Sequence, residues 1–130
     1  MARHFCASVF LINPEDKRIL LVKHKKFNKW VQPGGHIEDE ETGIKVKLLG
    51  ERFPREDDFI KPLGIQKNRN KEGDVHIDII YAGIPINDDE AQASDESIDI
   101  HWFTRKELDY IDLFPDIKIT YDYIINEIIK

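Results

Sequence analysis

The chain alternates short apolar segments with turn-forming residues, and this pattern restricts the fold more than any other feature of the sequence. Four segments are rich in branched and aromatic residues, as β-strands are: residues 5–12, 18–22, 75–86 and 98–103. Residues 115–130 instead carry apolar side chains at helical spacing, with Pro115 in the first turn, where proline is tolerated. Several strands with a terminal amphipathic helix predict an α/β domain.

Local signals refine this outline. Asn13-Pro14-Glu15-Asp16 predicts the turn of a hairpin, because proline fixes φ and Asn and Asp bond locally. Residues 44–49 alternate with lysines and predict a half-buried strand, whereas residues 51–73 predict a long loop or an irregular hairpin. Thr104 and Glu107 have the spacing of a capping box. The face of the terminal helix that we expect to be buried carries Ile117, Tyr121, Ile124, Ile125 and Ile128.

Length and charge exclude several classes of protein. The 130 residues fit one domain, and the formal net charge of −6 disfavours a general binder of the nucleic-acid backbone. Cys6 is the only cysteine, so no intramolecular disulfide can form and a reducing cytoplasm is expected. No apolar run approaches the roughly 20 residues that cross a bilayer. We therefore expect a cytoplasmic protein that binds neither nucleic acid nor membrane.

A glycine turn followed by acids carries the clearest chemical signal. Pro33-Gly34-Gly35 comes directly after a short apolar segment, and Glu38, Asp39, Glu40 and Glu41 follow. Glycines let the backbone come close to a ligand, and adjacent carboxylates ionise together only when solvent or a cation screens them. Mg²⁺ takes oxygen ligands and shares its shell with substrate phosphates. A surface turn would have the same composition, so the flanking residues decide between the two interpretations.

With those flanks, the segment resembles the start of the Nudix box of the Nudix (MutT-like) hydrolases. Gly35 matches the opening glycine of the box and Glu41 follows six positions later, as the pattern requires; Thr42-Gly43-Ile44 matches its close. The order of the strands, the Trp102-Phe103 segment and the terminal helix is also similar to that of the family. The resemblance implies an α/β/α sandwich of Nudix type with a mixed β-sheet.

The resemblance has one clear departure. The family pattern separates the two glycines by 21 positions, but Gly43 follows Gly35 by 8, so thirteen residues are missing between Glu38 and Gly43. The missing part includes the glutamates that hold the metals in the family and the helix that would cover the second face of the sheet. Glu41 can be counted as the first box glutamate or as the last one. Either the natural polypeptide contains a segment that this sequence lacks, which we favour, or the protein is a Nudix-like shell without hydrolysis.

The resemblance implies a Mg²⁺- or Mn²⁺-dependent hydrolase of a small nucleoside diphosphate linked to another group, within a single domain of residues 1–130. The alternative is an inactive nucleotide-binding or regulatory module, and a homodimer is left open. The implied metal ligands are the Gly34 carbonyl and Glu41. Glu41 and Glu96 are the implied catalytic residues, and substrate contacts are assigned to Lys23, Gly35, His36 and Glu38.

Several other residues have a structural and a functional interpretation. Lys23, Lys25 and Lys26 could meet phosphate charge or form a solvated strand end. Trp30 and Trp102 could stack on a base, although packing in the core is the commoner role of such residues. For His76 and His101 we expect ordinary strand positions, because the histidines share no ligand spacing.

Overall fold

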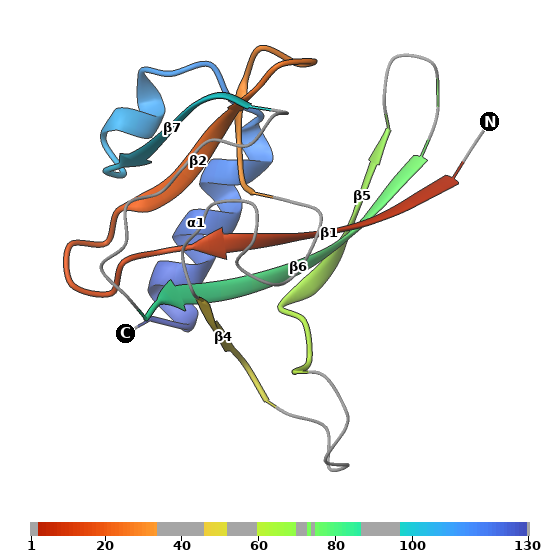
Figure 1. Ribbon diagram of the computed structural model, residues 1–130. Coiled ribbons are helices and arrows are strands. Elements are labelled where there is room, and N and C mark those ends of the chain that lie inside the picture. The colour runs from red at the N-terminus through yellow and green to blue at the C-terminus, as the bar shows by residue number, and fades with distance from the viewer. Residues whose placement is uncertain are drawn as a thin grey trace.

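The computed structural model describes residues 3–33, 46–51, 60–69, 73, 75–86 and 97–129, which form two β-sheets and a C-terminal helix (Figure 1). Sheet A contains β1 (Arg3–Leu11), β4 (Val46–Leu49), β5 (Gly64–Arg69) and β6 (Val75–Pro85). Sheet B contains β2 (Ile19–His24), β3 (Trp30–Val31) and β7 (Ser97–Phe103). The 3-10 helix η2 (Glu107–Asp109) and α1 (Pro115–Glu127) complete the described elements. None of the described helices is long and apolar enough to cross a membrane.

Strand β6 organises sheet A. It pairs in parallel with β1 along one edge, from Arg3 opposite Val75 to Leu11 opposite Gly83. Along its other edge it pairs antiparallel with β5 and then with β4. Sheet B is antiparallel, with β2 between β3 and β7. The sheet that contains β1 and β6 is therefore mixed, as the sequence predicts.

The predicted turn at residues 13–16 is confirmed, because Asn13 Oδ1 accepts the Glu15 N–H at 2.9 Å and Asp16 Oδ1 accepts the Arg18 N–H at 3.0 Å. The strands on either side of it meet only at the isolated antiparallel bridge between Ile12 and Ile19 and then join different sheets. Of the two predictions for residues 51–73, the hairpin is correct for its second half, since β5 pairs with β6.

The main core lies between α1 and one face of the strands, and Figure 1 shows α1 behind them. Phe10, Ile80 and Phe103 pack there against Ile117 and Ile124 of α1. Leu11 and Leu20 point to the opposite face, where they pack with Val46, Ile100 and Trp102. Side chains of β1 and β2 are thus buried on both faces of these strands.

The predicted apolar face of α1 is correct except at its end. Ile117, Tyr121 and Ile124 are buried, but Ile128 is 38% exposed and Ile129 is buried in its place. The helix ends at Glu127 and the Ile128 N–H bonds to the Ile124 carbonyl as the C-cap. The 3.6-residue period therefore no longer applies beyond Glu127.

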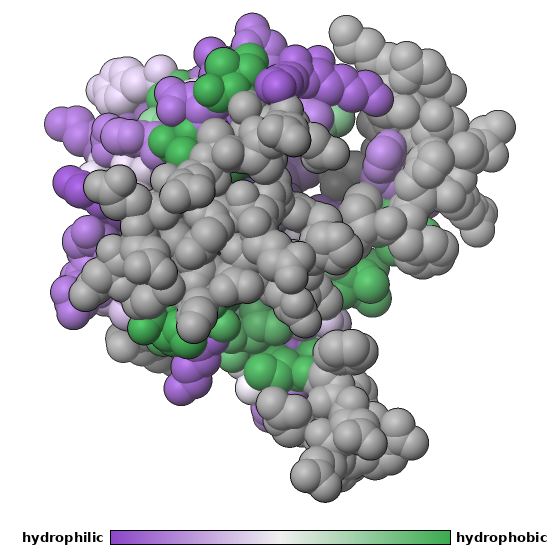
Figure 2. Space-filling model, in the orientation of Figure 1, coloured by the Kyte–Doolittle hydropathy of each residue, from purple (hydrophilic) through white to green (hydrophobic). Residues whose placement is uncertain are grey.

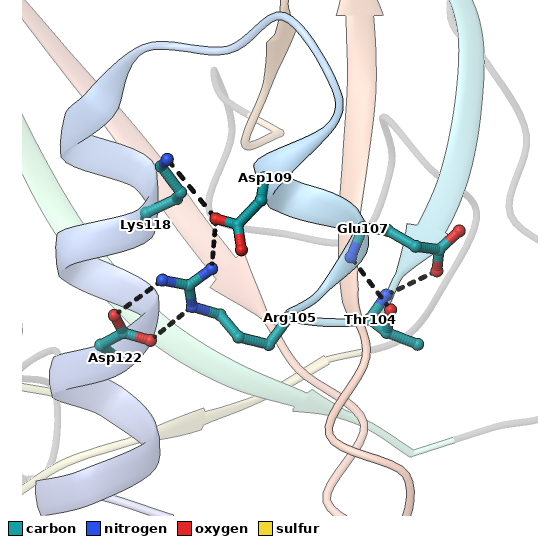
Figure 3. A network of polar contacts seen from close by, with 6 residues as sticks. All are labelled: Thr104, Arg105, Glu107, Asp109, Lys118 and Asp122. Carbon is teal, nitrogen blue, oxygen red and sulfur yellow. Dashed lines mark hydrogen bonds and ion pairs between the residues drawn. The ribbon is translucent and has the colours of Figure 1, made fainter.

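Polar contacts fix α1 against the segment after β7 (Figure 3). The capping box is confirmed: the Thr104 N–H donates to Glu107 Oε1 at 2.9 Å and the Glu107 N–H donates to Thr104 Oγ1 at 3.2 Å. Arg105 Nε donates to Asp122 of α1 at 2.8 Å and its Nη1 donates to Asp109 at 2.9 Å. These bonds hold the Arg105 guanidinium in its charged form, since they raise its pKa.

Candidate functional site

The described part of the candidate site is the segment that leads into the predicted glycine turn. β3 ends at Val31, and Gln32 and Pro33 continue along the free edge of β1. Pro33 is buried, and its carbonyl accepts the Val9 N–H at 3.1 Å. The chain therefore approaches the predicted turn along the edge of sheet A.

Most of the predicted site residues follow this point. Outside the described residues lie Gly34, Gly35, His36, Glu38, Glu41 and Glu96. Their assignments remain predictions. The described residues show how the chain approaches the turn.

A buried chain of hydrogen bonds ties Gln32 to sheet A. Ser8 Oγ donates to the carboxylate of Asp78, at 3.2 Å to Oδ1 and 3.1 Å to Oδ2. Gln32 Nε2 donates to Ser8 Oγ at 3.2 Å and reaches Asp78 Oδ2 at 3.5 Å. Ser8 is 8% exposed and Asp78 is 9% exposed. The three side chains connect β1, β6 and the segment after β3.

The environment of Asp78 is unusual for a carboxyl group. Burial raises the pKa of Asp78 above its ordinary value, and the hydrogen bonds from Ser8 and Gln32 lower it in part. A buried acid whose pKa is shifted by its surroundings is a candidate for a functional site. Sequence reasoning missed this residue, although a single acid within the apolar residues 75–86 was the available signal.

Lys23 is the one predicted site residue among those described. It lies half-buried in β2, opposite Trp30 of β3 and Asp99 of β7. These neighbours place it in sheet B, whereas the Ser8–Asp78–Gln32 chain begins in sheet A. Its predicted contact with substrate stays a prediction.

The lysines that follow Lys23 lie just beyond the end of β2. Lys25 and Lys26 are exposed in the turn after β2, and the Lys26 ammonium lies 5.8 Å from the centroid of the Phe27 ring. His24 stacks on Phe27 with centroids 4.6 Å apart. Lys29 pairs with Asp112 at 2.6 Å. The solvated interpretation of this end therefore fits Lys25 and Lys26.

Both tryptophans pack against the core, as the structural interpretation predicts. Trp30 meets Phe103 edge-on at a centroid distance of 4.8 Å, and Trp102 packs against Leu11 and Leu20. His101 is an exposed strand residue whose ring contacts Phe103. These side chains contribute to packing between β2, β3 and β7.

The described residues offer no ready-made metal site. Within the described ranges, no group of three or more His, Cys, Asp or Glu side chains converges on a position where it could hold a metal ion. The carboxylate of Asp78 already accepts hydrogen bonds from Ser8 and Gln32. The predicted ligands, the Gly34 carbonyl and Glu41, lie outside the described residues. A metal site would thus have to be formed with residues of the predicted box.

Figure 2 shows the same side of the molecule as Figure 1, with hydrophilic side chains along the left and upper edges of the described surface. Apolar residues come to the surface mainly at the lower edge of this view. Described residues of sheet B and its turns also expose apolar side chains, among them Phe27 and Ile98.

Comparison with known proteins was made against family models, curated sequences and solved structures. The model of the NUDIX domain matches residues 2–125. None of the curated sequences that were compared matches the chain. A NUDIX-family hydrolase from Clostridium perfringens is 23% identical, with a TM-score of 0.75 and coverage of 97% of this chain and 98% of that chain.

Two further structures carry ligands or activities in their names. The NUDIX domain of Shewanella oneidensis NrtR, complexed with ADP ribose, is 14% identical with a TM-score of 0.67, covering 97% of this chain and 88% of that one. A C. elegans Ap4A hydrolase in a binary complex is 13% identical with a TM-score of 0.67, covering 97% and 96%. At these identities the likeness establishes the fold, and the predicted α/β sandwich is confirmed.

Proposed function

The chain belongs to the NUDIX domain family, as the sequence predicts, and we propose that it is a cytoplasmic, metal-dependent pyrophosphohydrolase. Its substrate class is a nucleoside diphosphate linked to a second group. The observation that carries the proposal is the family match over residues 2–125, which includes the strand and glycine turn of the box. The proposal treats residues 1–130 as one domain.

The chemistry requires a divalent cation at the diphosphate. Mg²⁺ or Mn²⁺, held by the Gly34 carbonyl and Glu41, would offset charge on the diphosphate and activate a water. In the proposal Glu96 accepts the proton of the attacking water. Lys23, Gly35, His36 and Glu38 bind and orient the substrate, which lowers the entropy that the reaction must lose. Sheet A supplies a rigid start for the glycine turn, because the Pro33 carbonyl is bonded to Val9.

A second candidate is supported by the spacing of the box. Gly43 follows Gly35 by 8 positions, so the segment that bears the family's metal-binding glutamates is missing from this sequence. A chain of this length would retain the fold and a nucleotide site without hydrolysis. The NUDIX domain of NrtR was crystallised with ADP ribose, which makes this nucleotide a suitable probe of binding.

One experiment separates the two candidates. The protein is first weighed by intact mass spectrometry, and ADP ribose and Ap4A are then incubated with it in Mg²⁺ or in EDTA. Phosphorus-31 NMR that shows new phosphate monoesters only in Mg²⁺, and little product with Glu41→Gln, would support the enzyme. Calorimetric binding of ADP ribose without turnover, by a chain whose mass equals that of 130 residues, would support the binding module. Absence of both binding and turnover would contradict both proposals.

A further inference from the structure

We infer that Gln32, held by Ser8 and Asp78, is a positioning residue that fixes how the chain approaches the predicted glycine turn along the free edge of β1. The inference rests on the proposed function, because it concerns the turn to which that proposal assigns the metal and the substrate. Gln32 and Pro33 are the last described residues before Gly34. Any movement of these two residues is passed to the turn through the peptide chain.

The donors and acceptors of the chain fix a single arrangement. The amide nitrogen Nε2 of Gln32 can donate but not accept, so it donates to Ser8 Oγ. The hydroxyl of Ser8 then has its own hydrogen for Asp78, whose carboxylate accepts it. The Asp78 carboxylate also accepts a longer contact from Gln32 Nε2, at 3.5 Å. The direction of every bond is therefore determined by the chemistry of the groups.

The position of the chain within the fold makes these bonds effective. Ser8 and Asp78 lie on neighbouring strands of sheet A, which are paired over the whole length of β1. Gln32 directly follows β3, which is a strand of sheet B. The bonds therefore join the segment after β3 to a rigid pair of strands, and the Val9–Pro33 bond lies directly beside them.

The burial of Asp78 favours a role in addition to packing. Burying a carboxylate is costly even when it is hydrogen-bonded, and an apolar residue of similar size would pack at lower cost. Burial raises the pKa of Asp78, which reflects this cost. Costly buried polar groups are common where a site must be held in one geometry. Removal of a residue that hydrogen-bonds to a site residue often lowers activity or affinity about 10–100-fold.

The Val9 amide provides a readout on the described residues. Its hydrogen is bonded to the Pro33 carbonyl, so its exchange with deuterium reports whether Pro33 stays against β1. Gln32→Leu removes both donor contacts at a half-buried position, and Ser8→Ala breaks the same chain from the other end. Thr120→Val is the matched control, because it removes the Gln66–Thr120 bond of 3.0 Å between sheet A and α1.

We expect the Val9 amide hydrogen to exchange with deuterium at least about 10-fold faster in Gln32→Leu and Ser8→Ala than in the parent chain or in Thr120→Val. If the parent hydrolyses ADP ribose, kcat should fall about 10–100-fold with KM little changed, while the melting temperature stays within a few degrees. Exchange at Val9 that is unchanged in both variants would overturn the inference. If the parent shows no turnover, the proposed function fails while Val9 exchange still decides the positioning role.

Discussion

Substitution of Gly83 by alanine is the sharpest test of how β4 packs against β6. Gly83 lies opposite Leu11 of β1 and Leu48 of β4, in the middle of three paired strands. A Cβ at this position would come within 2.5 Å of Val46 Cγ1 and 3.2 Å of Val9 Cγ2. Because carbon atoms do not approach this closely, β4 or the valines must move.

The expected magnitude follows from two opposing effects. Overpacking of a filled core costs about 1–3 kcal/mol, whereas replacing glycine by alanine gains about 0.4–1 kcal/mol by restricting the unfolded chain. We therefore expect Gly83→Ala to lower the free energy of unfolding by about 1–2 kcal/mol. At about 4 °C per kcal/mol for a domain of this size, the melting temperature should fall by roughly 4–8 °C.

Gly64 is the matched control within the same sheet. It lies in β5, and a Cβ there would meet nothing within 4 Å. Among the described glycines the left-handed region holds Gly50 and Gly73 but neither Gly64 nor Gly83, so alanine is not strained at either of the latter two. Gly64→Ala should be neutral or stabilising by up to about 1 kcal/mol.

The assay is thermal and urea unfolding followed by circular dichroism, with Val46→Ala as a relieving change. Val46 truncation removes the methyl group that the new Cβ would meet, so the double variant Gly83→Ala/Val46→Ala should be more stable than the sum of the single effects predicts. A Gly83→Ala variant as stable as Gly64→Ala would refute the reasoning. A double variant whose effects simply add would show that Val46 is not the obstacle.

Three further predictions concern single side chains. Burial raises the pKa of Asp78, so the stability that this group contributes is present below the ordinary pKa of aspartate and is lost as the pH rises through the raised pKa. The melting temperature of Asp78→Asn, a position that also faces His76, minus that of the parent should therefore be larger at pH 7 than at pH 4. An equal difference at both pH values would contradict this. Tyr121→Phe loses the 2.6 Å bond to the Lys17 carbonyl and should cost about 0.5–1.5 kcal/mol in urea unfolding; no loss would mean that water replaces the bond. Ile124→Ala, fully buried, should cost about 2–5 kcal/mol, whereas Ile119→Ala, 67% exposed, should change stability by less than about 0.5 kcal/mol; similar losses would contradict the assigned face of α1.

The sequence predicts the elements that depend on neighbouring residues. Strands β1, β2, β6 and β7 follow from short branched apolar runs, and the turn at residues 13–16 follows from side chains that bond to their own backbone. The capping box is equally local, because Thr104 and Glu107 are three residues apart. These signals need no knowledge of the rest of the chain.

Pairing between distant residues could not be read in the same way. The parallel pairing of β1 with β6 joins segments more than sixty residues apart, and apolar periodicity is the same for either strand direction. Strand β5 is mostly polar and carries exposed Ile65, so its pattern resembles a loop until β6 pairs with it. Ser8, Asp78 and Gln32 come from three such segments, which explains why the sequence did not reveal their contact.

The sheet face opposite α1 is covered differently from what the sequence predicts. The missing part of the box includes the helix that would cover this face. Loss of such a helix should cost more than the roughly 5–15 kcal/mol by which domains are stable, which favours an omitted segment. Leu11 and Leu20 are nevertheless buried on that face against Val46, Ile100 and Trp102, which come from β4 and β7. Strand residues thus supply part of the cover that the sequence assigns to a helix. Absence of the helix would therefore expose less apolar surface at this part of the sheet, and the intact mass of the polypeptide decides between an omitted segment and a shortened box.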